Sequence, residues 1–126
     1  MSDPVNHPAH YQRPDGMECI ELAELLPFCE GNAIKYLWRA GQKGSLLEDL
    51  QKALWYAKRA SDRAWWWPRR TGHVYVVERA CMGFDSQLVR DAIRALANGN
   101  AEASIASIQT LIDVAAMKAA NREEAA

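Results

Sequence analysis

Apolar residues recur at the three- and four-residue spacing of an α-helix through most of the first half of the chain. The first such stretch follows Asp15 and Glu18, a spacing typical of a capped helix start, and Pro27 ends or kinks it. Its apolar positions are Cys19, Leu22, Ala23 and Leu26. The pattern therefore predicts a first helix between this cap and Pro27.

A second and a third helix are predicted on either side of a short loop that contains two glycines. The second runs from about Glu30 to Arg39 and is stopped by Gly41 and Gly44, and Ser45 with Glu48 forms a capping box for the third. The apolar stripe of the second helix is Ala33, Ile34, Leu37 and Trp38. The inward positions of the third helix are Leu46, Leu47, Leu50, Leu54 and Ala57. The pattern allows this helix to extend as far as Trp65.

The middle of the chain is less regular. Three adjacent tryptophans, Trp65–Trp67, cannot all face inward on one helix, so at least one is expected to contact a partner subunit, a ligand or the other half of the chain. Arg69–Gly72 is expected to form a loop. Val74–Val77 is either a short strand or part of a helix, because four residues do not decide between the two.

Two more helical patterns close the chain. Asp85 is the expected N-cap of a helix that runs through Leu96 and ends at Gly99. Asn100 caps the last helix, and residues 121–126 are expected to fray. The apolar stripe of that last helix is Ile105, Ile108, Leu111, Ile112 and Ala115.

These patterns predict an all-α fold of helical hairpins packed as a small bundle, with at most one short strand near Val74–Val77. A length of 126 residues suits one domain, in which 1–15 is a proline-containing arm, 16–67 a helical core and 68–126 a helical extension. No apolar run reaches the roughly 20 residues of a membrane helix, so no membrane partner and a cytoplasmic location are expected.

Charge is distributed unevenly, although the net charge is only -1. Residues 1–33 carry one basic and six acidic residues, residues 34–70 carry nine basic and three acidic ones, and the rest carries five and seven. A nearly neutral chain with a basic middle suggests a local anion site and argues against duplex nucleic acid as the partner. A solvated helix face balanced by the acidic first third is the alternative.

The basic residues of the second and third helices are predicted to share one groove. Asn32, Lys35 and Arg39 lie on one face of the second helix by their spacing. The corresponding face of the third helix carries Asp49, Lys52, Tyr56, Arg59 and Arg63. A short loop makes the two helices antiparallel, so their cationic side chains can converge on phosphate oxygens, with backbone N–H groups near Lys43 and Ser45.

The N-terminal arm holds a second candidate group. His7 and His10 could supply an acid, a base or a phosphate donor, and Tyr11 could stack on a base. An arm that only packs over the helices is the alternative. The three cysteines have no C-x-x-C spacing and no histidine at a zinc-ligand spacing, so no metal site is predicted.

Three motifs in order resemble a known family. They are V-N-H-P-A-H-Y at Val5–Tyr11, G-N-A-I-K-Y-L-W-R-A-G at Gly31–Gly41 and E-D-L-Q-K-A-L-W-Y at Glu48–Tyr56, and G-M-E-C-I-E at Gly16–Glu21 lies between the first two. The run Val5–Arg59 is similar to a small phage-encoded family, long listed as a domain of unknown function, that includes the nucleotide kinase of the T-odd coliphages. That kinase lacks a P-loop, and no P-loop spacing occurs here either.

The resemblance implies a phage nucleotide-binding protein that is kinase-like and acts on (deoxy)nucleoside phosphates in the cytoplasm of an infected bacterial host. As a kinase it would use Mg²⁺ with a nucleoside triphosphate, with Asp49 and His10 as catalytic residues. The expected nucleotide-binding residues are His7, His10, Tyr11, Asn32, Lys35, Tyr36, Arg39, Lys43, Lys52, Tyr56 and Arg59. The alternative is a non-catalytic, oligomeric protein that sequesters cyclic or NAD-derived nucleotide signals of bacterial immunity, without a cofactor. A homo-oligomer is expected for either function.

Overall fold

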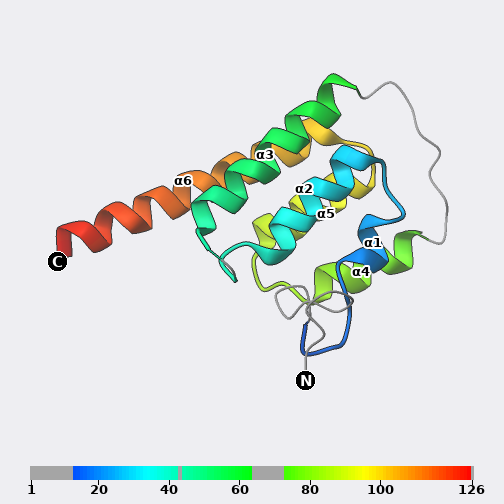
Figure 1. Cartoon of the computed structure of the whole chain (residues 1–126), viewed down its shortest axis with the longest axis horizontal. Coiled ribbons are helices and arrows are strands. Elements are labelled where there is room, and N and C mark those ends of the chain that lie inside the picture. The colour runs from blue at the N-terminus through cyan, green and yellow to red at the C-terminus, as the bar shows by residue number, and fades with distance from the viewer. Residues whose placement is uncertain (1–12, 43, 64–72, 126) are drawn as a thin grey trace.

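The computed structural model describes residues 13–42, 44–63 and 73–125. Within these ranges the chain forms six α-helices and no strand, which confirms the predicted all-α fold (Figure 1). The helices are α1 (Ile20–Ala23), α2 (Phe28–Arg39), α3 (Leu46–Asp62), α4 (His73–Met82), α5 (Gln87–Ala97) and α6 (Ala101–Ala125).

The helices of both halves of the chain surround one hydrophobic core. The α2–α3 hairpin packs against the second half, because α3 contacts α6 and α2 contacts α5. Among the described residues, Trp38 has the largest fully buried side chain, and the other members of its core cluster come from five helices. Among them are Leu22, Leu50, Val77, Ile93 and Ile108. The end of α6 continues past this body toward the C-terminus (Figure 1).

Side-chain caps fix three of the helix starts. The Ser45 hydroxyl accepts a hydrogen bond from the Glu48 N–H at 3.2 Å, and the Asn100 side-chain oxygen accepts one from the Ala103 N–H at 3.2 Å. Both caps were predicted. The predicted cap at Asp85 is wrong, because Ser86 caps α5 by accepting from the Val89 N–H.

Three helix boundaries differ from the predicted ones, and the open choice between strand and helix at Val74–Val77 is decided. Asp15 does not cap α1, because its carboxylate accepts from the Met17 N–H two residues on and forms a turn. The helix α2 begins at Phe28, directly after Pro27. The strand alternative for Val74–Val77 is wrong, because this segment lies in α4, and α6 continues through Ala125 without the expected fraying. The predicted Trp65–Trp67 contacts and Arg69–Gly72 loop fall outside the described residues.

The inward face of α3 also differs from the predicted stripe. Leu46 is 42% exposed, whereas the buried positions include three alanines and one carboxylate. They are Asp49, Leu50, Ala53, Ala57 and Ala60. Alanines on this face allow neighbouring helices to approach closely, and Asp49 is buried as part of that contact.

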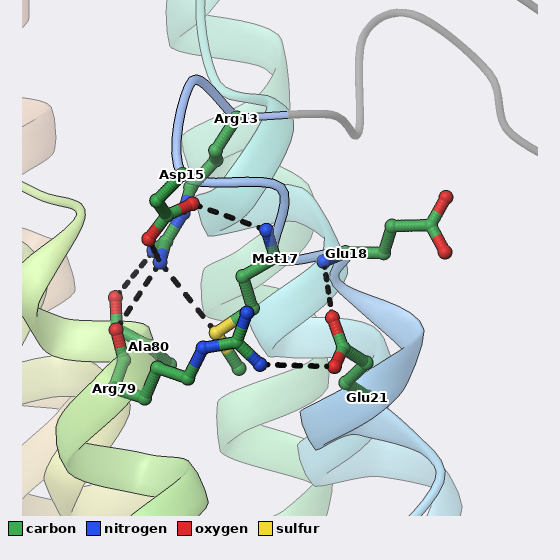
Figure 2. A network of polar contacts seen from close by, with 7 residues as sticks. All are labelled: Arg13, Asp15, Met17, Glu18, Glu21, Arg79 and Ala80. Atoms are coloured by element: carbon green, nitrogen blue, oxygen red, sulfur yellow. Dashed lines mark hydrogen bonds and ion pairs between the residues drawn. The ribbon is translucent and has the colours of Figure 1, made fainter.

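Arg13 joins the start of the described chain to α4 (Figure 2). Its guanidinium donates to the carbonyl oxygens of Ala80 at 2.6 Å and Arg79 at 3.1 Å, forms an ion pair with Asp15, and lies 4.7 Å over the ring of Trp38. The carbonyls at the end of a helix have no partner inside the helix. Arg13, more than sixty positions away in the sequence, therefore donates the hydrogen bonds that two carbonyl oxygens at the C-terminal end of α4 accept.

No helix in the described part of the chain is both long enough and apolar enough to cross a membrane.

Glu30 gives the fold a testable pH dependence. Its side chain is buried on α2, and burial raises the pKa of this carboxyl above its ordinary value. As pH rises, the unfolded chain loses this proton first, so folding stability falls. We expect Glu30→Gln to raise the melting temperature at pH 7, with a smaller gain below pH 4. An equal gain at both pH values, measured by thermal denaturation, would contradict this assignment.

Candidate functional site

Two tyrosines form the centre of the candidate site on the α2–α3 hairpin. The rings of Tyr36 and Tyr56 stack with centroids 5.9 Å apart and planes 13° from parallel. Each ring comes from the half-buried face of its helix, so the stack joins the two helices at the surface of the core. This arrangement places the Tyr36 ring between the cationic residues of both helices.

Three cationic groups surround the Tyr36 ring. Lys35 Nζ lies 4.9 Å from the ring centroid, Lys52 Nζ lies 5.5 Å from it, and Arg39 Cζ lies 5.6 Å from it. No two of them can therefore be more than about 11 Å apart, twice the longest of these distances. The helices thus bring together three of the five cations that helical spacing placed on the predicted groove, Lys35, Arg39 and Lys52, whereas Arg59 and Arg63 are not among the described cations near this ring. We call Lys35, Tyr36, Arg39, Lys52 and Tyr56 the tyrosine–cation cluster.

A buried ion pair holds Arg39 in the cluster. Arg39 Nε lies 3.3 Å from Asp49 Oδ1, and Asp49 is only 2% exposed. The second carboxylate oxygen of Asp49 is also buried and has no hydrogen-bond partner within the described residues. The prediction that Asp49 shares the exposed face of Lys52 is therefore wrong: Asp49 lies on the inward face with Ala53 and Ala57.

The two lysines of the cluster have different electrostatic environments. Lys52 pairs with Glu48 at 3.0 Å, one turn earlier on the exposed face of α3, and this partner raises the pKa of Lys52. An exposed pair of this kind is weak and readily exchanges for another anion. No described carboxylate forms an ion pair with Lys35. Within the cluster, Lys35 is thus the cation that an incoming anion can reach without displacing a described carboxylate.

Exposed aromatic rings continue the cluster along the surface. Phe28 is 75% exposed and meets Tyr56 edge to face at 6.2 Å, and Trp55 is 60% exposed and meets the same ring at 5.0 Å. Large exposed aromatic rings can stack on the faces of planar ligands. The surface therefore combines cations with stacking groups.

A cavity of about 390 Å³ opens beside the cluster, between α1 and the first half of α2. Its walls are mainly apolar, and Lys35 belongs to both the cavity and the cluster. Other residues that line the cavity include Cys19, Ala23, Glu24, Phe28, Gly31 and Asn32. Burial raises the pKa of the Cys19 thiol to about 12, so this wall carries a neutral thiol. The cavity was not predicted.

The remaining predicted residues are placed as follows. Asn32 lines the cavity, and its side-chain amide donates to the Phe28 carbonyl at 2.8 Å. Arg59 is exposed on α3 and is not among the described cations near the Tyr36 ring. The positions of His7, His10, Tyr11 and Lys43 fall outside the described residues.

Neither a disulfide nor a metal-type cluster occurs among the described residues. Cys19, Cys29 and Cys81 are free. No three described His, Cys, Asp or Glu side chains lie close enough together to hold a metal ion.

Residues 5–58 match a family described as "Protein of unknown function (DUF3310)". The matched span agrees with the stretch in which the three motifs lie and ends inside α3, so it includes the whole tyrosine–cation cluster. It includes no residue of α4, α5 or α6. No curated protein and no solved structure matched the chain.

Proposed function

We propose that the protein binds a nucleotide or a nucleotide-like phosphate ligand at the tyrosine–cation cluster. The observation that carries the proposal is the placement of Lys35, Arg39 and Lys52 around one ring, which concentrates positive charge where two helices meet. Lysine and arginine donate charge-assisted hydrogen bonds to phosphate oxygens. The exposed rings of Phe28 and Trp55 add stacking surface for the planar part of such a ligand.

The resemblance of Val5–Arg59 to the phage-encoded family extends this proposal. We propose a phage protein that acts in the cytoplasm of the infected host and transfers phosphate between (deoxy)nucleoside phosphates. Mg²⁺ would enter with the nucleoside triphosphate, as part of the substrate. The burial of Asp49 supports a positioning role for this residue through Arg39 rather than direct contact with the ligand.

The same burial favours a second candidate function, which is binding without chemistry. The carboxylate that the kinase hypothesis places at the phosphates lies on the inward face of α3. A protein that sequesters a nucleotide signal needs cations and stacking rings and no general base.

Lys35, which forms no ion pair with a described carboxylate, gives the sharpest test of binding at the cluster. We expect Lys35→Ala to weaken the binding of ATP or of a deoxynucleoside monophosphate about tenfold, because a charge-assisted hydrogen bond to phosphate is lost. Titration calorimetry measures this, with Lys118→Ala on the exposed end of α6 as the matched control. Unchanged affinity in Lys35→Ala, with the helical content of the parent, would overturn the assignment of the site.

A turnover assay separates the two candidate functions. The full chain is incubated with ATP, Mg²⁺ and each deoxynucleoside monophosphate, and the products are resolved by chromatography. Formation of the deoxynucleoside diphosphate together with an equal amount of ADP supports the kinase. Tight binding without any product, together with an intact nucleotide released from the denatured protein, supports sequestration.

A further inference from the structure

We infer that the site extends along α3 from the tyrosine–cation cluster to Arg59, and that it takes nucleotides joined by a phosphodiester, in which one nucleoside separates two phosphate groups. The inference rests on the proposed function, because the first phosphate occupies the cluster. It adds a second phosphate position and thereby names the class of ligand.

The contacts between α2 and α3 fix the direction in which the site extends. Arg39 pairs with Asp49, and Tyr36 stacks on Tyr56. Phe28, at the start of α2, also contacts Tyr56. Residue numbers therefore fall along α2 as they rise along α3, so the two helices run antiparallel (Figure 1). The turn of α3 that follows Tyr56 thus leads away from Arg39 and toward the start of α2.

Arg59 supplies a cation on that turn. It lies seven residues after Lys52, and this spacing puts both side chains on one face of α3. The two positions are about 10 Å apart along the helix axis, because each residue adds about 1.5 Å. Arg59 is exposed, and it forms no ion pair with a carboxylate in the described part of the chain. This face of α3 therefore has a second cationic end, separate from the cations around Tyr36.

The charge of this part of α3 stays positive beyond Arg59. From Lys52 to Arg63 the chain carries four basic residues and one acidic residue, Asp62. Arg63 is exposed and lies four residues after Arg59, so it continues the same face. A row of exposed cations attracts the phosphates of linked nucleotides.

Aromatic rings lie between the two cationic ends. Tyr56 comes between Lys52 and Arg59 on α3, and its ring contacts the exposed rings of Phe28 and Trp55. Stacking on such rings tolerates any base, because every base has a π-face. A base that stacks here would have cationic side chains on both sides of it.

This arrangement distinguishes linked nucleotides from single ones. A nucleoside 5′-diphosphate or 5′-triphosphate carries all its phosphates at one end of the sugar, so it occupies the cluster without reaching Arg59. Two nucleotides joined by a phosphodiester carry a second phosphate on the other side of the first nucleoside. The same chemistry occurs in a short single strand and in a cyclic dinucleotide.

Titration calorimetry of the full chain tests the inference with three ligands. They are dADP, the 5′-phosphorylated dinucleotide pdApdA, and cyclic di-AMP. The two phosphates of dADP are adjacent, whereas a nucleoside separates those of the other two ligands. We expect pdApdA or cyclic di-AMP to bind at least about tenfold more tightly than dADP, because a second charge-assisted hydrogen bond to phosphate forms. The tighter of the two identifies a linear strand or a cyclic ligand as the source of this chemistry.

Replacing Arg59 with alanine separates the second phosphate position from the first. Arg59→Ala is expected to lower the affinity for the tighter linked ligand about tenfold and to leave the affinity for dADP unchanged, whereas Lys35→Ala lowers both. Lys58→Ala is the matched control, because Lys58 is exposed on the same helix but lies about 100° around the axis from Arg59. This control is expected to change the affinity for the linked ligand about twofold or less.

The outcomes keep this inference separate from the proposed function. Equal affinities for dADP and both linked ligands, with Lys35→Ala still weakening all three, would overturn the second phosphate position and leave the proposed function standing. Unchanged affinity for the linked ligand in Arg59→Ala, with the helical content of the parent by circular dichroism, would overturn it as well. Failure of all three ligands to bind would overturn the proposed function itself.

Discussion

Replacing Arg39 with alanine is expected to lower the free energy of unfolding by about 3 kcal/mol, because the buried Asp49 carboxylate loses its guanidinium partner. Chemical denaturation of the purified variant measures the change. Lys52→Ala is the matched control: it breaks the exposed pair with Glu48 and is expected to cost less than about 1 kcal/mol.

A double variant distinguishes the loss of a partner from the loss of packing. Arg39→Met combined with Asp49→Leu removes both charges and keeps apolar volume, so it is expected to recover most of the stability that Arg39→Ala loses. Stability within 1 kcal/mol of the parent in Arg39→Ala would show that the ion pair contributes little. This sensitivity also makes Lys35 the better position for binding measurements, since the Lys35 side chain makes no ion pair with a described carboxylate.

Arg13→Ala is expected to cost about 3 kcal/mol of stability as well. The variant removes charged hydrogen bonds to the carbonyls of Arg79 and Ala80 and uncovers the ring of Trp38. Thermal and denaturant unfolding measure the loss. Arg122→Ala, on the exposed end of α6, is expected to change stability by less than about 0.5 kcal/mol.

Gly83 provides an independent test of the same contact. A side-chain carbon at this position would lie 2.0 Å from the guanidinium of Arg13, so Gly83→Ala must displace it. We expect Gly83→Ala alone to destabilise the fold, and to add little further cost in a chain that already carries Arg13→Ala. Fully additive losses in the double variant would show that the two residues act separately.

Helix positions were largely predictable because apolar spacing and side-chain caps are local signals. Ser45 and Asn100 each cap the helix that their sequence context predicted. The errors lie where a local signal competes with another local bond or with distant packing. Asp15 has the spacing of a cap, but it forms a turn and pairs with Arg13.

The site was predictable in part. Helical spacing correctly brought Lys35, Arg39 and Lys52 together, because it depends on two neighbouring helices and a short loop. The burial of Asp49 was missed, although Ala53 and Ala57 at four-residue spacing from it gave a signal of a closely packed face. The cavity depends on how α1 lies on α2, which periodicity in a four-residue helix does not encode.

The shared core has a consequence for the stretch that matches the family. Trp38 and Leu50 lie within this stretch, and their core neighbours include Val77, Ile93 and Ile108 from beyond it. A polypeptide that ended at residue 58 would leave this apolar surface in contact with water. The matched stretch therefore shares its interior with α4, α5 and α6 in this protein, and these helices keep its apolar side chains away from water.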